Sequence, residues 1–301
     1  MVKRLLLIDA NSIMHRAFHA LPPLKKKNGE MVNAVYGFLL IFIKSIKDFR
    51  PDYIITAFDL PAPTFRHKKY KEYKAKRVAA PQEFYNQIPM VKELLRLFKV
   101  PVLEKAGFEA DDIIGTVSRR FPEKETEIII LSGDNDILQL VNKKTKVSAP
   151  KRGIKDVILY DENTVKERFG GLTPEQLVDY KGLRGDASDN IPGVRGIGEK
   201  TATSLLLEFK SLKNIYNNLE DIPGRTKQLL EESKDQAFLS RELGEIDTNV
   251  PIKINLKDCL WGKYEKEKIL EEIDSYQFSS LRGRVEELMG GGKIGENLKL
   301  W

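Results

Sequence analysis

Cysteine is nearly absent from this sequence. Cys259 is the single one among 301 residues, so no disulfide can form within the chain. There is also no apolar run of the roughly 20 residues that a helix needs to cross a bilayer, and no signal-peptide cleavage pattern follows Met1. These absences argue against a disulfide-stabilised secreted protein and a membrane-spanning protein. We expect a cytoplasmic monomer without a membrane partner.

Charge of one sign is not in large excess overall. The 50 Lys and Arg stand against 44 Asp and Glu, and 41% of the residues are apolar, which excludes a disordered acidic or basic tail. The excess is local, because residues 65–77 (FRHKKYKEYKAKR) carry seven basic residues and one acidic residue, equal to the whole formal charge of +6. A basic run with interleaved aromatics is typical of a polyanion-binding surface, and a solvated helix face is the alternative.

The first half alternates short apolar runs with longer amphipathic stretches, which predicts parallel strands joined by helices. Strands are expected at residues 4–8, 53–58, 100–103, 127–131 and 157–160. Helices are expected at residues 34–49, 82–98 and 111–121. We therefore predict an α/β domain over residues 1–172, with a mainly parallel central sheet flanked by helices.

Strand alternation disappears after about residue 172. Helical patterns separated by Gly and Pro turns follow, at residues 173–180, 199–209, 224–233 and 234–246. We predict an all-helical domain over residues 173–289. Residues 290–301, which begin with three glycines, are expected to be a linker or a frayed tail. At about 150 residues per domain, a 301-residue chain has room for two.

Acidic residues follow the predicted strands. The strand-end carboxylates are Asp9, Asp59, Asp134 and Asp136. Parallel strands end at one edge of a sheet, so these groups should converge where open α/β folds bind ligands. Five more carboxylates lie at a helix start and in a polar loop, namely Glu109, Asp111, Asp112, Asp186 and Asp189.

Nine converging carboxylates would repel one another unless cations lay between them. All-oxygen ligands favour Mg²⁺, which Mn²⁺ can replace, and two such ions can activate water for phosphodiester hydrolysis. The alternative is that each Asp merely caps a helix or turn, which explains any one of them better than all nine together.

A glycine-rich segment opens the helical region. Gly193, Gly196 and Gly198 are spaced as GxxGxG with no preceding strand, so a dinucleotide-binding fingerprint is excluded. A tight glycine turn between two helices, at about residues 191–206, resembles the helix-hairpin-helix element that grips a duplex backbone. Arg195 and Lys200 would add charge there, and an ordinary glycine-capped helix connection is the alternative.

The motifs occur together in an order that resembles one family. LLLIDANS, NAVYGF, AFD, TFRHKKYKEYKAKR, GFEADD, LSGDND and KGLRGDASDNIPGVRGIGEKTA resemble the 5′ nuclease (flap endonuclease) family, and closely the 5′-to-3′ exonuclease domain of bacterial DNA polymerase I. The resemblance spans roughly residues 3–285. It implies a PIN-like core with a helical arch at about residues 64–90 and a C-terminal helix-hairpin-helix domain.

The resemblance also implies roles for the acidic residues. One metal would be held by Asp9, Asp59, Glu109 and Asp111, with Asp112 beside them. The second would be held by Asp134, Asp136, Asp186 and Asp189. A K⁺ ion is a further candidate at the glycine hairpin.

The basic segment corresponds to the arch through which the 5′ single strand passes. Lys74, followed by Arg77, is expected to stabilise charge on the phosphate, with Asp9, Asp111 and Asp134 as the central catalytic carboxylates. Tyr70, Lys74 and Arg77 are expected on one helical face. Tyr73 is the expected base-stacking partner. Tyr36 and Arg66 are expected as further DNA contacts.

The predicted function is metal-dependent 5′-to-3′ exonuclease and 5′-flap endonuclease activity in lagging-strand primer removal and repair. DNA with a 5′ flap or end beside a duplex is the expected partner, together with RNA primers and a DNA polymerase in cis or in trans. A PIN-like ribonuclease and a non-catalytic duplex-binding scaffold are the alternatives.

Overall fold

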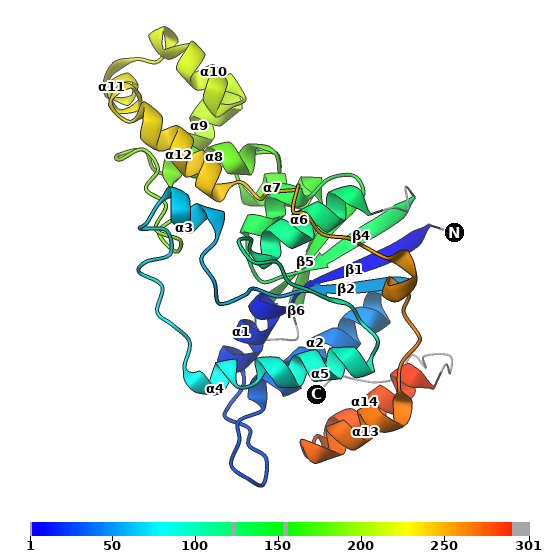
Figure 1. Ribbon diagram of the computed structural model, residues 1–301. Coiled ribbons are helices and arrows are strands. Elements are labelled where there is room, and N and C mark those ends of the chain that lie inside the picture. Colours follow the sequence, from blue (N-terminus) through cyan, green and yellow to red (C-terminus); the bar gives the residue numbers. More distant parts are fainter. Residues whose placement is uncertain (1, 122–124, 153–155, 291–301) are drawn as a thin grey trace.

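The computed structural model describes residues 2–121, 125–152 and 156–290 (Figure 1). A six-stranded sheet with the order β3-β2-β1-β4-β5-β6 forms the centre. The strands are β1 (Lys3–Asp9), β2 (Tyr53–Ala57), β3 (Val102–Leu103), β4 (Thr126–Leu131), β5 (Thr145–Arg152) and β6 (Asp156–Tyr160). Neighbouring strands are parallel except for β5 and β6, which are antiparallel. The predicted mainly parallel α/β sheet is confirmed.

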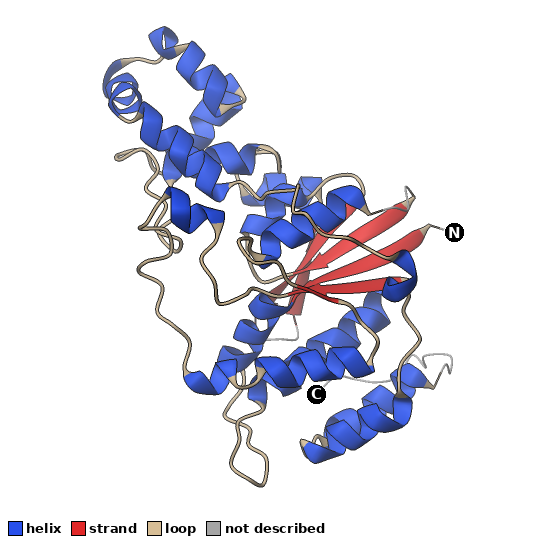
Figure 2. Cartoon of the chain, in the orientation of Figure 1, coloured by secondary structure: helices blue, strands red, loops and turns tan. Residues whose placement is uncertain are grey.

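Alternating residues of β1 point into two separate cores, as the period of a strand requires. Leu6 and Ile8 belong to the core formed with helices on one face of the sheet, and Leu5 and Leu7 belong to the core on the other face. The first core includes α1 (Ala10–Ala20), α2 (Asn33–Phe49) and α5 (Ile88–Leu97), and the second includes α6 (Ala110–Arg120). Figure 2 shows the strands between these helical layers.

Helix α1 and strand β5 are among the elements of the α/β part that were not predicted. Helix α1 begins directly after β1, because the side chain of Asp9 accepts a hydrogen bond from Ser12 N and caps the helix. Strand β5 reads TKVSAPKR, whose polar residues and Pro150 obscure the apolar alternation. Its register shifts between Pro150 and Arg152, at the pairing with β6.

The helical region extends away from the sheet (Figure 1). Helix α7 (Glu162–Arg168) still packs against β6, and the helices of this region are α8 (Gln176–Arg184), α9 (Glu199–Phe209), α10 (Leu212–Asn217), α11 (Gly224–Glu232) and α12 (Lys234–Gly244). Helix α12 packs along α8. Among the described residues, no helix combines the length and the apolar character that crossing a membrane requires.

The last two helices, α13 (Lys266–Ser275) and α14 (Ser279–Met289), pack back on the α/β part. They contact α5 and α2, and Ile269 and Leu281 share the core that holds Leu6 and Ile8. Residues 266–289 of the predicted helical domain therefore lie against α5 and α2, on the α/β part. Of the predicted tail, residues 291–301 lie outside the described residues.

The predicted helical arch is not a continuous helix. Helix α3 (Phe65–Lys69) ends after five residues and α4 (Gln82–Tyr85) is a single turn. A long connection of turns and coil joins them (Figure 1). Lys74 adopts a left-handed backbone conformation with φ of 55°, which no helix interior would contain.

Candidate metal and nucleic-acid site

Five of the predicted carboxylates line one cavity at the C-terminal edge of the sheet. The cavity has a volume of about 550 Å³, and three of the five, Asp9, Asp59 and Asp134, lie at strand ends. Asp9 is the last residue of β1, and its carboxylate accepts hydrogen bonds from Ser132 Oγ at 2.7 Å and from Ser12 N at 3.0 Å. The predicted convergence of strand ends is therefore present in this structure.

The start of helix α6 brings further carboxylates to the same cavity. Asp59, just after β2, accepts a hydrogen bond from Ala110 N at 2.8 Å, which ties the strand end to the first turn of α6. Glu109 is the N-cap of α6, and Asp111 follows in its first turn. Both side chains line the cavity with Asp59.

The carboxylates in this cavity are hard to ionise together. Burial, followed by the negative charges of Asp59 and Asp134, raises the pKa of Asp9 to about 7. Burial also raises the pKa of Asp59, and burial together with Asp9 raises that of Asp111. A bound cation would relieve this repulsion, so the electrostatics favour an ion among these groups.

We expect Asp9→Asn to stabilise the metal-free protein at high pH. The pKa of Asp9 is raised from 3.8 to about 7 in the folded chain, so its contribution to stability is complete below pH 4 and is lost as the pH rises through 7. The melting temperature of Asp9→Asn in EDTA should exceed that of the wild type by a margin that grows between pH 5 and pH 8. A margin independent of pH would contradict the electrostatic explanation.

A second acidic cluster lies beside the first. Carboxylate oxygens of Asp136, Asp186 and Asp189 lie within 4.8 Å of one another. Asp136 and Asp186 line a cavity of about 360 Å³, and Asp134 lines both cavities. This cluster brings the start of the 3-10 helix η1 (Asp136–Leu140) to the loop after α8.

Lys181, on α8, was not predicted as a site residue. Its ammonium contacts Asp136 and lies 2.9 Å from a carboxylate oxygen of Asp186. Burial raises the pKa of Asp136 to about 6, whereas Lys181, against the effect of burial, lowers the pKa of Asp186 to about 2. The sequence feature that could have identified Lys181 as a site residue is its position five residues before Asp186, on a helix that leads into the acidic loop.

Lys74 and Arg77 lie between the two acidic groups. Lys74 Nζ is 3.0 Å from Glu109 and 3.8 Å from Asp189, and Arg77 lies 3.5 Å from Asp189. The backbone N–H of Lys74 also donates to the carbonyl of Asp189 at 2.9 Å. The two cations converge as predicted, but the expectation of a shared helical face with Tyr70 is wrong, since α3 ends at Lys69.

The structure places other arch residues inside the protein. Arg66 is 3% exposed and binds Asp112 with two hydrogen bonds, so the prediction of Arg66 as a DNA contact is wrong. Asp112 is fully buried and paired with Arg66, which leaves it unsuited to the predicted metal set. Tyr73 is 3% exposed and donates to Glu109 or Asp189, so it cannot stack on a base here. Tyr70 packs against the cluster containing Tyr73.

The glycine hairpin has a packed part and an open part. The N–H of Gly193 donates to Ser240 Oγ and its carbonyl accepts from Gln236, so the predicted contact of Gly193 with phosphate is wrong. A Cβ on Gly193 would lie 2.3 Å from Gly185 N, which explains the glycine structurally. Exposed groups follow at Arg195, Gly196, Gly198 and Lys200, with Gly198 as the N-cap of α9.

Tyr36 and the pair of His15 and His19 line two different cavities. Tyr36 lines a third cavity with Tyr276 and Phe278, and its hydroxyl lies 3.0 Å from Ser280 Oγ, which does not support a DNA contact. His15 and His19 line the first acidic cavity. Burial, followed by the charge of His19, lowers the pKa of His15 to about 4, so this imidazole is neutral near pH 7.

The donor set fits hard divalent cations. The converging ligand atoms of Asp136, Asp186 and Asp189 are carboxylate oxygens, and five carboxylates line the first cavity. Carboxylate oxygens suit Mg²⁺ or Mn²⁺. Protein cations already lie against these oxygens, with Lys74 at Glu109 and Lys181 at Asp186. The carboxylates thus attract positive charge in this arrangement, as a metal site requires.

Comparison with known proteins identifies two adjoining domains. Residues 4–170 match the 5′-3′ exonuclease N-terminal resolvase-like domain, and residues 172–267 match the 5′-3′ exonuclease C-terminal SAM fold. DNA polymerase I of Bacillus subtilis (strain 168) is 42% identical over 286 residues, covering 95% of this chain and 32% of the polymerase. For DNA polymerase I of Chloroflexus aurantiacus the identity is 41% over 288 residues, covering 94% and 30%. The chain spans about a third of these relatives' length.

Solved structures share the fold at low sequence identity. A T5 5′-exonuclease structure with bound divalent metal ions (zinc) has a TM-score of 0.68 and 19% identity, covering 96% of this chain and 99% of that chain. The catalytic core of Rad2 in complex with DNA substrate has a TM-score of 0.61 and 19% identity, covering 95% and 92%. With both of its domains matched in order from residue 4 to residue 267, the chain belongs to the 5′-3′ exonuclease family.

Proposed function

We propose that this chain is a metal-dependent 5′ nuclease that hydrolyses a phosphodiester where a 5′ single-stranded flap or end meets a duplex. The observation that carries the proposal is the meeting of two carboxylate groups, with Asp134 in the wall of both cavities and Lys74 and Arg77 between them. The family membership agrees with this chemistry.

Two groups of residues would hold Mg²⁺, or Mn²⁺ in its place. Asp9, Asp59, Glu109 and Asp111 form one group, and Asp134, Asp136, Asp186 and Asp189 form the other. Two such ions, when bound, activate a water molecule and stabilise the leaving oxygen of a phosphodiester. Water adds to phosphorus and the 3′ oxygen leaves, so the products carry a 5′-phosphate and a 3′-hydroxyl.

The basic segment would orient the phosphate. The ammonium of Lys74 already faces carboxylates of both groups, and the guanidinium of Arg77 faces Asp189 of the second group. A phosphate between the groups would accept hydrogen bonds from both cations. His15 and His19 line the same cavity and bound the space available to the terminal nucleotide. Shape at this cavity, rather than base identity, would select the substrate.

The exposed half of the glycine hairpin would hold the adjoining duplex. Gly196, Gly198 and Lys200 present backbone and ammonium donors at the start of α9, where phosphate oxygens are favoured. Such contacts are independent of sequence and weaken with salt. A K⁺ ion at this hairpin is a further part of the proposal.

This activity suits displaced flaps and the RNA primers of lagging-strand synthesis. The polymerase relatives connect it with replication and repair, and a DNA polymerase would act beside it in cis or in trans. We further propose that the chain acts in the cytoplasm and as a monomer.

Three labelled substrates test the proposal: a 5′-flap duplex, a linear single-stranded RNA and a blunt duplex, each with Mg²⁺ or with EDTA. We expect metal-dependent cutting of the flap duplex near its junction, in preference to the other two. Cleavage of the RNA alone would support a PIN-like ribonuclease. Duplex binding without cleavage would support a non-catalytic scaffold.

A further inference from the structure

The last two residues of α12 and the three that follow it, Leu243–Asp247, contact α6 and η1, each of which carries part of one acidic cluster. We refer to this segment as the brace. On one side, Asp247 N donates to Asp112 on α6 at 2.9 Å. On the other side, Gln139 of η1 donates to the carbonyl of Gly244 at 3.0 Å and accepts from Ile246 N at 3.0 Å. The brace therefore joins the start of α6, which carries Asp111, to η1, which begins at Asp136.

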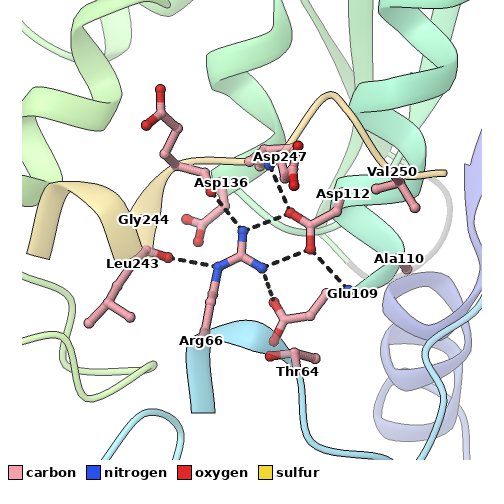
Figure 3. Close-up of polar contacts among 12 residues, drawn as sticks. Thr64, Arg66, Glu109, Ala110, Asp112, Asp136, Leu243, Gly244, Asp247 and Val250 are labelled. Carbon is pink, nitrogen blue, oxygen red and sulfur yellow. Dashed lines mark hydrogen bonds and ion pairs between the residues drawn. The ribbon is translucent and has the colours of Figure 1, made fainter. Parts of the chain in front are cut away.

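Arg66 fastens the brace to α6 (Figure 3). Its Nε donates to the carbonyl of Leu243 at 2.9 Å and one terminal nitrogen donates to that of Glu245 at 2.7 Å. The same guanidinium forms hydrogen bonds of 2.7 and 2.8 Å with both carboxylate oxygens of Asp112. Asp112 in turn accepts from Glu109 N at 3.0 Å, so the N-cap of α6 is held by the same network.

Arg66 also lies beside a predicted metal ligand. A terminal nitrogen is 3.5 Å from Glu109, whose other carboxylate oxygen faces Lys74 at 3.0 Å. Arg66 and Asp112 are 3% and 0% exposed, so water does not compete for these bonds. The guanidinium of Arg66 is planar, and its donors are all bonded in a site without water. It therefore fixes the positions of Asp112 and the brace more tightly than the ammonium of a lysine could.

The far end of α12 is fixed as well. Ser240 and Gln236 bind the N–H and the carbonyl of Gly193 in the hairpin. The helix that leads into the brace is thus held at the proposed duplex-binding hairpin and at the acidic site. A displacement of the brace would alter the distance between the two carboxylate groups.

We propose that Arg66 is a positioning residue that, through the brace, sets the spacing between the two groups of metal-binding carboxylates. This inference rests on the proposed function. Catalysis across two ions depends on ligands held to within a fraction of an ångström, so a looser brace should slow cleavage without weakening DNA binding.

Arg66→Lys and Gln139→Met test the two ends of the brace independently. The first keeps the charge but loses the planar fork. The second removes the contacts of η1 with Gly244 and Ile246, together with the hydrogen bond of Gln139 to the carbonyl of Asp136. We expect each to lower the single-turnover rate on a 5′-flap duplex at least about tenfold, with the dissociation constant for that duplex, measured in Ca²⁺, changed less than about threefold. If Arg66→Lys does not fold, Gln139→Met still tests the spacing.

The magnetic coupling between two bound Mn²⁺ ions, read by electron paramagnetic resonance, is the measurement that a purely structural role would not change. It should differ from the wild type in both variants. Arg96→Lys is the matched control, since Arg96 lies on α5 and its guanidinium binds Glu93 on the same helix with hydrogen bonds of 2.8 and 2.6 Å, away from the brace. It loses the same planar fork, and its rate and Mn²⁺ coupling should stay as in the wild type.

Rates and coupling equal to the wild type in both brace variants, below their melting temperatures, would overturn the inference. A wild-type protein that binds no Mn²⁺ pair and cuts no flap would instead overturn the proposed function. The two failures are therefore distinguishable in one set of measurements.

Discussion

Asp134→Ala is expected to lower the single-turnover rate of flap cleavage by at least about 10³-fold while flap affinity changes less than about threefold. Asp134 lies in the wall of both acidic cavities, and its charge contributes to the raised pKa values of Asp9 and Asp111. Removing it takes a ligand from the place where the two groups meet. The exposed half of the hairpin, which would grip the duplex, is left untouched.

Rapid quenching with excess enzyme gives the rate for Asp134→Ala, and fluorescence anisotropy in Ca²⁺ gives the affinity. Asp48→Ala is a suitable control, because it removes a carboxylate whose ion pair with Lys44 lies on the surface of α2. That variant should cut at the wild-type rate. Wild-type turnover by Asp134→Ala would refute the assignment of the site.

Lys74→Ala should lower the single-turnover rate about 10²-fold with a smaller change in affinity. The ammonium lies 3.0 Å from Glu109 and 3.8 Å from Asp189, so it is placed to stabilise charge that develops on a phosphate between the two groups. Its pKa is raised: burial opposes the charged form, but Glu109 and Asp189 outweigh it. The side chain therefore stays protonated at neutral pH.

Lys76→Ala is the matched comparison for Lys74→Ala, because Lys76 is an exposed lysine of the same segment. Its loss should weaken flap binding slightly through reduced charge, with the rate at saturating enzyme unchanged. If Lys74→Ala behaved in the same way, Lys74 would be a tether for DNA and would have no part in the chemical step.

The centre of the sheet could be predicted because β1, β2 and β4 are short, strongly apolar runs. Residues 4–8 and 127–131 lie within β1 and β4, and the carboxylates that follow such runs must meet at one edge of a parallel sheet. Asp9, Asp59 and Asp134 therefore converge as expected. Strand β5 could not be predicted from its composition, because its pairing with β4 and β6 is what makes this segment a strand.

The basic segment shows where sequence reasoning fails. Its charges suggested that Arg66 and Tyr73 face DNA, yet both are buried against acidic partners. A charged residue is normally exposed, and only tertiary structure reveals a carboxylate such as Asp112 at bidentate distance. The helical spacing of Tyr70, Lys74 and Arg77 also led to a wrong prediction of one shared face. Helix α3 ends at Lys69, and Lys74 has a positive φ.

Long-range packing explains the remaining differences. Helices α13 and α14 have apolar faces that fit any core, and the sequence contains no sign that they cover α2 and α5. The contacts of Gly193 with Ser240 and Gln236 could not be predicted either, because they join residues more than forty positions apart. Such pairings follow from the fold and have no local pattern.

Cleavage of a 5′-flap duplex in H₂¹⁸O tests the central claim most directly. With Mg²⁺ present, mass spectrometry should find one ¹⁸O atom in the 5′-phosphate of the product cut at the junction and none at the 3′-hydroxyl, and EDTA should abolish the products. Cleavage that persists in EDTA, or a label on the 3′ side of the cut, would contradict metal-dependent attack of water at this site.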